Sequence, residues 1–142
     1  MYKQILIPLD NSAADETILK HIRPLAKLMQ SKIILVHVAD GYVARFQEQL
    51  NLQDSEEIKK DRIYLESRKN ELTQNGFSVT AYLVAGEPSK LILDIAQKES
   101  CDLIAMSTHG HRFVKDLILG SVAEDIRHRT SIPILMLRAP ST

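Results

Sequence analysis

Four short stretches of this 142-residue chain are apolar at almost every position, and they restrict its fold more than any other feature. A strand that is apolar on both faces is typical of a parallel sheet covered by helices on each side. A fifth stretch, 77–84, alternates apolar and polar residues, which indicates a strand with one partly solvated face at a sheet edge. The four apolar stretches are Ile5–Leu9, Ile33–Val38, Leu103–Met106 and Ile134–Leu137.

Helical periodicity fills the segments between these strands. The first predicted helix begins at Ser12 and the last at Ser121, because each serine is followed three residues later by an acidic residue, as in a capping box. A further helix is predicted to begin at Asp54. Another begins at Pro88, since proline is favoured as a first helical residue. Strands that alternate with helices predict right-handed crossovers. We therefore expect a single doubly wound α/β domain over residues 1–142, with a five-stranded parallel sheet in the order 3-2-1-4-5 and helices on both faces.

The balance of charged residues argues against two classes of partner, nucleic acids and membranes. Lys and Arg together number 18, as do Asp and Glu, so the formal net charge is zero. Domains that bind nucleic acid are usually basic, and a neutral chain has no broad attraction to an anionic membrane. No apolar run approaches the roughly 18 residues of a membrane span, and the N-terminus lacks the features of a signal peptide. We expect neither nucleic acid nor membrane as a partner, and a cytoplasmic location.

The sequence offers few candidates for a metal centre. Cys101 is the single cysteine, so no intramolecular disulfide is possible, and a small buried apolar role is expected for it. His37 lies inside a predicted strand and is interpreted as a core histidine with its hydrogen bonds satisfied. His109 and His111 lack the further ligands that a zinc site needs. No protein metal site is predicted.

The carboxyl ends of the strands are where an open α/β sheet binds ligands, and three such tips contain polar or glycine residues. Asp10 ends the first strand, where its carboxylate can accept hydrogen bonds from ribose hydroxyls or, alternatively, cap the first helix. Gly110 and Gly120 permit a close approach of backbone to a ligand. The amides of Ser121 and Val122, at the predicted start of the last helix, suit a phosphate. The alternative for this second region is a simple turn and capping box.

At this point the chain resembles a single-domain universal stress protein over nearly all of its length. The ATP-binding branch of that family carries the pattern G-x2-G-x9-G-[ST]. In this chain Ser107 stands at the first glycine, while Gly110, Gly120 and Ser121 match the rest. The resembling stretches are Ile5-Leu6-Ile7-Pro8-Leu9-Asp10, Leu35-Val36-His37-Val38, residues 103–122 and Ile132–Leu137.

The resemblance implies an adenine nucleotide, ATP or else AMP or ADP, with Mg²⁺ bridging its phosphates. It places Asp10, at the Pro8-Leu9-Asp10 tip, and the backbone around Ser107 against the ribose. It also implies that the main chain of Val38 contacts the adenine. The phosphates would be held by Gly110, Gly120, Ser121 and Val122.

Two features of this region leave alternatives open. A serine at position 107 opposes binding if the backbone there needs a positive φ, but its small hydroxyl can instead bond a ribose oxygen. His111 and Arg112 either donate to a polyphosphate or remain solvated loop side chains.

The function predicted from these residues is that of a regulatory or stress-response module that binds ATP or AMP. Slow hydrolysis of ATP is one alternative, although no general base with an orienting partner is recognisable. A nucleotide-free interaction module is the other. The resemblance also implies a homodimer in which Ile134–Leu137, an apolar edge strand, pairs with its copy across a two-fold axis.

Overall fold

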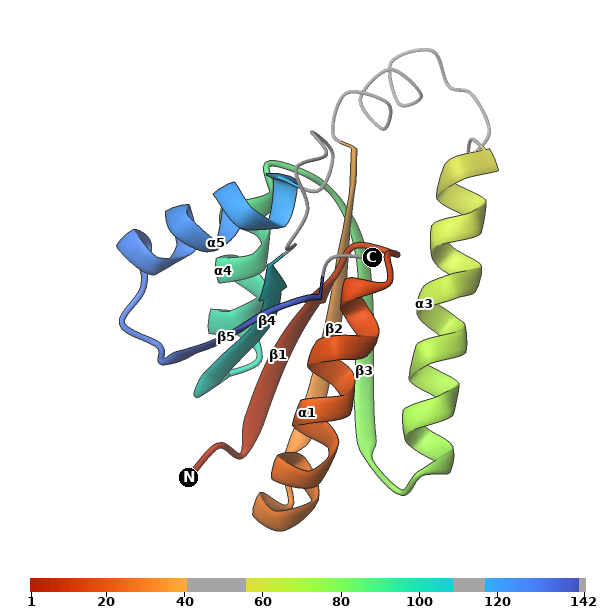
Figure 1. Cartoon of the computed structure of the whole chain (residues 1–142), viewed down its shortest axis with the longest axis vertical. Coiled ribbons are helices and arrows are strands. Elements are labelled where there is room, and N and C mark those ends of the chain that lie inside the picture. The colour runs from red at the N-terminus through yellow and green to blue at the C-terminus, as the bar shows by residue number, and fades with distance from the viewer. Residues whose placement is uncertain (41–55, 109–116, 141–142) are drawn as a thin grey trace.

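The computed structural model describes residues 1–40, 56–108 and 117–140, in which strands and helices alternate along the chain (Figure 1). This alternation confirms the predicted α/β fold. The elements are β1 (Gln4–Leu9), α1 (Ala14–Met29), β2 (Lys32–Asp40), α3 (Glu56–Gln74), β3 (Ser78–Gly86), α4 (Pro88–Lys98), β4 (Leu103–Thr108), α5 (Leu117–Arg129) and β5 (Ile134–Arg138).

The five strands form one parallel sheet in the order β3-β2-β1-β4-β5, as predicted. The chain adds β2 and β3 on one side of β1 and then crosses to the other side to add β4 and β5. The strand with alternating residues, β3, lies at an edge, which confirms the interpretation of its pattern. The point where the chain changes direction lies between β1 and β4. Ligands of open α/β sheets bind at such a switch point.

Each face of the sheet is covered by a pair of helices, with α1 and α3 on one face and α4 and α5 on the other (Figure 1). Alternate residues of the central strands point to opposite faces, so both sets are buried. One core joins Ile5, Ile7, Ile33 and Leu35 to α1 and α3, and the other joins Leu6, Ile34, Val36 and Ile104 to α4 and α5. Among the described residues no helix is long and apolar enough to cross a membrane.

The predicted helix starts agree with the structure at one position and differ at two. α4 begins at Pro88, as predicted, whereas α1 begins at Ala14, two residues after the predicted Ser12. α3 ends at Gln74, just before Gly76 with its φ of +94°. The predicted start of α3 at Asp54 lies outside the described residues. The predicted start of the last helix at Ser121 is wrong, because α5 begins four residues earlier at Leu117. Residues 117–119 are good helix formers, and a glycine inside a helix costs only about 1 kcal/mol, so Gly120 does not end the helix there.

Candidate functional site

The hydrogen-bonded pairing of β1 with β4 stops before the two strands reach their carboxyl ends. The register between them joins Ile5 to Leu103 and Leu6 to Ile104, whereas the register between β1 and β2 continues to Leu9 and His37. The two strands at the switch point are therefore paired at their amino ends and unpaired beyond.

Pro8 supplies a physical reason for this early end. The backbone N–H and C=O of Gln4 both face β4, where they bond the Asp102 carboxylate and the Asp102 amide at 3.0 Å. Backbone groups alternate in direction along a strand, so Leu6 and Pro8 face β4 as well. Proline has no N–H to donate, so the ladder toward β4 loses its next hydrogen bond. The early end of the β1–β4 ladder thus follows from one residue of the first strand.

The turn between β1 and α1 is held by side chains on both sides of it. The Ser12 hydroxyl donates to Asp10 Oδ1 at 2.5 Å, and its oxygen accepts from the Ala14 N–H at 3.2 Å. Asp15 does not bond the Ser12 N–H, as a capping box would require, but accepts from the backbone amides of Asp10 and Asn11. Asp10 is half-buried at the end of β1.

Asp15 is a buried carboxylic acid beneath this turn, with 1% of its surface exposed. Its two oxygens accept from the amides of Asp10 and Asn11, and the Tyr64 hydroxyl donates to Oδ2 at 2.6 Å. Burial raises the pKa of Asp15 to about 6, and the charge of Asp10 adds to this rise against the opposing hydrogen bonds. Asp15 therefore changes protonation near neutral pH while holding the Asp10–Asn11 backbone.

His37 lies at the end of β2 with both ring nitrogens in contact with polar atoms, which confirms its interpretation as a satisfied core histidine. Nδ1 lies 2.8 Å from the carbonyl oxygen of Leu9, and Nε2 lies 3.0 Å from Asp61 Oδ2. Asp61, from the first turns of α3, also accepts from the Asn11 side-chain amide at 3.1 Å. These contacts join β1, β2 and α3 at one end of the sheet.

A cluster of ion pairs continues along the interface between α1 and α3. Arg23 contacts Glu16 and Glu71 at 3.2 and 2.6 Å, and Arg68 contacts the same two carboxylates at 2.8 and 3.2 Å. Arg68 Nε also donates to the Tyr64 hydroxyl at 3.2 Å. Burial opposes the ionisation of Glu16, but the hydrogen bonds from the two arginines outweigh it and lower the pKa of this carboxyl. α3 is thus attached to α1 largely through charged groups.

Ser107, at the position of the first motif glycine, is buried at 1% exposure. Its hydroxyl donates to the carbonyl oxygen of Ala14, in the first turn of α1, at 2.7 Å. The suggested hydrogen bond between this hydroxyl and a ribose oxygen stays a prediction, and because the proton is used here, the serine oxygen would accept from a ribose hydroxyl.

The other predicted site residues have different outcomes. Pro8 and Leu9 are buried in β1, and Val38 near the end of β2 is half-buried. The side chain of Val122 is part of the core under α5, while Ser121 is exposed. Both residues lie inside α5, so their amides are past the first turn, where helical carbonyl groups accept them. Gly110, His111 and Arg112 lie outside the described residues, as does His109, and of Gly120 only the helical backbone is described.

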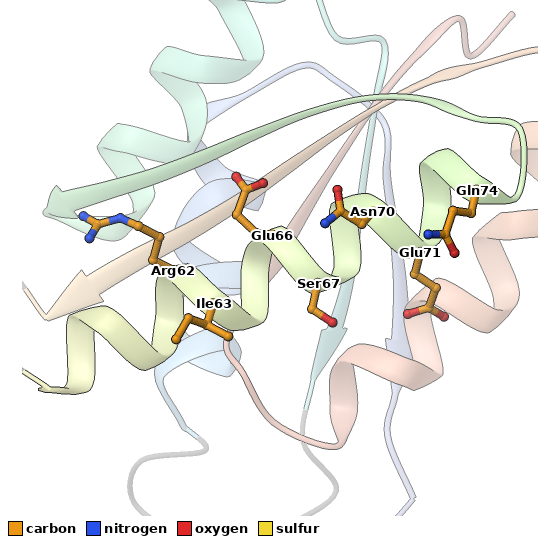
Figure 2. Close-up of a pocket in the computed structure, with 7 residues that line it drawn as sticks. All are labelled: Arg62, Ile63, Glu66, Ser67, Asn70, Glu71 and Gln74. Carbon is orange, nitrogen blue, oxygen red and sulfur yellow. The ribbon is translucent and has the colours of Figure 1, made fainter.

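Two further regions bear on function. Cys101 is buried, and burial raises the pKa of its thiol to about 12, as expected for a small apolar residue. No group of three potential metal ligands occurs among the residues described. Figure 2 shows an open hollow lined by one face of α3, which runs along the helix away from the strand ends. It is lined by Arg62, Ile63, Glu66, Ser67, Asn70, Glu71 and Gln74.

Sequence reasoning missed the two buried acids, Asp15 and Asp61. A signal for both was present. Asp15 precedes Ile18 by three residues and Ile22 by seven, so it lies on the apolar face of α1. Asp61 precedes Leu65 by four residues on α3. An acid at core spacing indicates a buried hydrogen-bonded group, because an unpaired carboxylate is excluded from a core.

The fold and this switch-point geometry can now be compared with known proteins. Residues 1–138 match the model of the universal stress protein family. The chain belongs to this family. It is 32% identical to universal stress protein MJ0577 of Methanocaldococcus jannaschii, over 97% of this chain and 96% of that protein. A solved structure of protein MJ0577 superposes with a TM-score of 0.81 at 33% identity, covering 100% of this chain and 99% of that one.

Two other solved members of the family share the fold at lower identity, and both contain a nucleotide. A universal stress protein from Archaeoglobus fulgidus in complex with dAMP has a TM-score of 0.69 at 20% identity, over 95% of this chain and 97% of that one. A universal stress protein in complex with cAMP has a TM-score of 0.68 at 16% identity, over 96% of this chain and 97% of that one. At these identities the likeness shows the fold alone.

Proposed function

We propose that this universal stress protein binds an adenine nucleotide, ATP or AMP, at the carboxyl ends of β1, β2 and β4. In this role the chain is a regulatory or stress-response module, whose occupied and empty states are distinguished by a partner. Membership of the family supports the proposal, as do the two related structures that hold dAMP and cAMP.

The observation that carries the proposal is the early end of the β1–β4 ladder at Leu6 and Ile104. The ladder thus ends short of the switch point, where ligands of this fold class bind. Asp10 is half-buried at this end of β1, and its carboxylate is an acceptor of the kind that ribose hydroxyls need. The Ser107 hydroxyl is bonded to the Ala14 carbonyl of α1.

The residues then take the following roles. Asp10 and the backbone at Ser107 hold the ribose, and the main chain of Val38 contacts the adenine. The phosphates lie toward the residues before α5, where Mg²⁺ would offset part of their charge. The amides of Ser121 and Val122 are bonded within the helix, so the contact at this position is through the exposed Ser121 side chain. The residues assigned to bind the phosphates are Gly110, His111, Arg112, Gly120, Ser121 and Val122.

Calorimetry with Mg-ATP and with AMP tests the proposal directly. We expect binding by the wild-type chain and a loss of about tenfold or more in affinity for Asp10→Ala, since a hydrogen bond to a charged group is removed. Gly120→Val abolishes binding of the triphosphate by placing a branched side chain against it. Asp94→Asn, a remote exposed carboxylate on α4, is the matched control and leaves the affinity unchanged. Absence of binding at millimolar nucleotide would overturn the proposal.

Mass spectrometry of the protein as purified provides an independent test. Adenine nucleotide that copurifies supports the binding role, whereas a chain that is empty and binds nothing when titrated is a nucleotide-free interaction module. Steady-state assays address the hydrolase alternative. We expect far less than one turnover per second, because His37, the histidine described at these strand ends, is buried with both ring nitrogens engaged by Leu9 and Asp61 and has none left to activate a water.

The exposed edge of β5 supports a second part of the proposal, a homodimer. β5 is an edge strand, and Met136 on it is a large apolar residue with 42% of its surface exposed. Pairing with a second copy would cover this edge. Light scattering at micromolar concentration should give the mass of a dimer, and Met136→Glu should shift it toward the monomer. Ile63→Glu, an exposed apolar site on α3, is the control that leaves the mass unchanged.

A further inference from the structure

The contact between His37 Nε2 and Asp61 Oδ2 requires a proton between the two atoms. A carbonyl oxygen only accepts hydrogen bonds, so His37 Nδ1, at 2.8 Å from Leu9 O, carries a hydrogen. Nε2 and Asp61 Oδ2 lie 3.0 Å apart, and without a proton between them two acceptors would face each other. One proton therefore lies between Nε2 and Oδ2 and joins the two side chains in a hydrogen bond.

This buried pair contacts the chain immediately beside the residues assigned to the nucleotide. The ring bonds the carbonyl of Leu9, the residue before Asp10, and His37 itself precedes Val38. The other oxygen of Asp61 accepts from Asn11, the residue after Asp10. Asn11 has a φ of +62°, in the left-handed region that asparagine tolerates better than most other residues with a side chain.

We propose that Asp61 is a positioning residue for the nucleotide site, which shares one buried proton with His37 and, through His37 and Asn11, fixes the ends of β1 and β2. This inference rests on the proposed function. α3 then acts on the site from outside, because its first turns hold Asp10 and Val38 in place without contacting the ligand.

Other charged groups at this end of the molecule take part in the same cluster. From α1, Asp15 accepts from the Asn11 amide, and from α3, Tyr64 donates to Asp15 while Arg68 donates to Tyr64. Asp10 lies on the turn itself and accepts from Ser12. On the other side of β2, His37 is in register with the apolar Leu83 of β3. Among these described groups, Asp61 alone joins the turn after β1 to the ring of His37.

Calorimetry with Mg-ATP at pH 7.5 separates positioning from general stability. Asp61→Ala should weaken binding by about tenfold, because the Asn11 amide and the His37 ring lose a shared buried partner. Leu72→Ala removes a fully buried side chain from the far end of α3 and is the matched control. It should lower stability against urea at least as much as Asp61→Ala and leave the affinity unchanged. Equal affinities of Asp61→Ala and wild type, or an equal loss in Leu72→Ala, would overturn the inference.

The isosteric variant Asp61→Asn supplies the rescue. Its carbonyl oxygen accepts from Asn11, and its amide donates to a neutral His37 Nε2, so we expect affinity close to that of the wild type. Nitrogen NMR of labelled histidine gives the signature that stability alone does not move. The Nε2 signal of wild-type His37 should show a hydrogen bond that shares a proton with the Asp61 carboxylate, and in Asp61→Asn it should become that of a nitrogen that accepts from an amide. A wild-type Nε2 signal that Asp61→Asn leaves unchanged, or an asparagine variant as weak as the alanine variant, contradicts the proposal.

The same experiments distinguish this inference from the proposed function. A wild-type chain that binds no nucleotide overturns both. A wild type that binds, with Asp61→Ala binding equally well, overturns the role of Asp61 and leaves nucleotide binding in place.

Discussion

α4 and α5 pack on one face of the sheet through apolar side chains. On the opposite face, α3 buries few apolar residues and contacts its neighbours mainly through charged and polar groups. Ile92, Ile95 and Ala96 of α4 join the core with Val122, Ala123 and Ile126 of α5. α3 buries Leu65 and Leu72, and otherwise contacts its neighbours through Asp61, Tyr64, Arg68 and Glu71. Apolar contact is insensitive to pH and salt, while the contacts of α3 respond to both. The face that borders Asp10 is therefore the responsive one.

The largest effect is expected on the apolar face. Ile92→Ala removes a side chain that is 1% exposed and should lower the free energy of unfolding by about 3 kcal/mol. Because the loss is one of apolar packing, it should be the same at pH 5 and pH 8 and at low and high salt. Urea unfolding under these four conditions measures it. A loss that varies with pH would remove the distinction between the two faces.

An intermediate effect is expected from Asp15, at the start of α1. The pKa of this carboxyl is about 6 in the folded protein and lower in the unfolded chain, so the folded state binds the proton more tightly. Stability should therefore fall as the pH rises from 4 to 7, by on the order of 3 kcal/mol at most. Asp15→Asn should lack this dependence.

The measurement is urea unfolding of the wild type and of Asp15→Asn across this pH range. The quantity compared is the difference between their free energies of unfolding at each pH. Asp10→Asn supplies the control, because removal of the neighbouring negative charge should lower the pKa of Asp15 as followed by carboxyl carbon NMR. A difference that rises with pH would show that Asp15 is stabilised as the carboxylate instead.

The smallest effect is expected from the ion pairs of α3. Arg68→Met breaks contacts with Glu16 and Glu71 and should cost about 1 kcal/mol at low ionic strength, and less at 1 M salt because of screening. The exposed pair of Lys90 with Asp94 on α4, at 2.9 Å, is the matched control. Asp94→Asn should leave the urea midpoint unchanged at either salt concentration. Equal effects at both positions would show that the cluster on α3 has no special role.

The strands could be predicted from the sequence because burial on both faces leaves a direct pattern of apolar residues, and the alternating residues of 77–84 indicated that this strand lies at an edge. The start of α5 could not be predicted, since Gly120 and Ser121 have the local features of a helix boundary although the helix continues through them. Local chemistry decides such a boundary only when the preceding residues are poor helix formers. Residues 117–119 are good ones.

The candidate site was predictable where it depends on strand ends and unpredictable where it depends on distant partners. Asp10 follows from its place after β1. The burial of Asp15 depends on Tyr64, 49 residues away, and the role of Asn11 depends on Asp61, 50 residues away. A periodic pattern shows that a polar residue faces the core, but not which group will meet it there. Only the folded chain supplies that pairing.

Pro8 has a consequence for the energetics of any molecule that enters between β1 and β4. A ligand that inserts between two paired strands must break their hydrogen bonds, and its own contacts must compensate for the free energy lost. Here the backbone of β1 has no N–H to offer at this point, and the register with β4 has already ended at Leu6. A ligand at these strand ends therefore has no β1–β4 backbone hydrogen bond beyond Leu6 to displace.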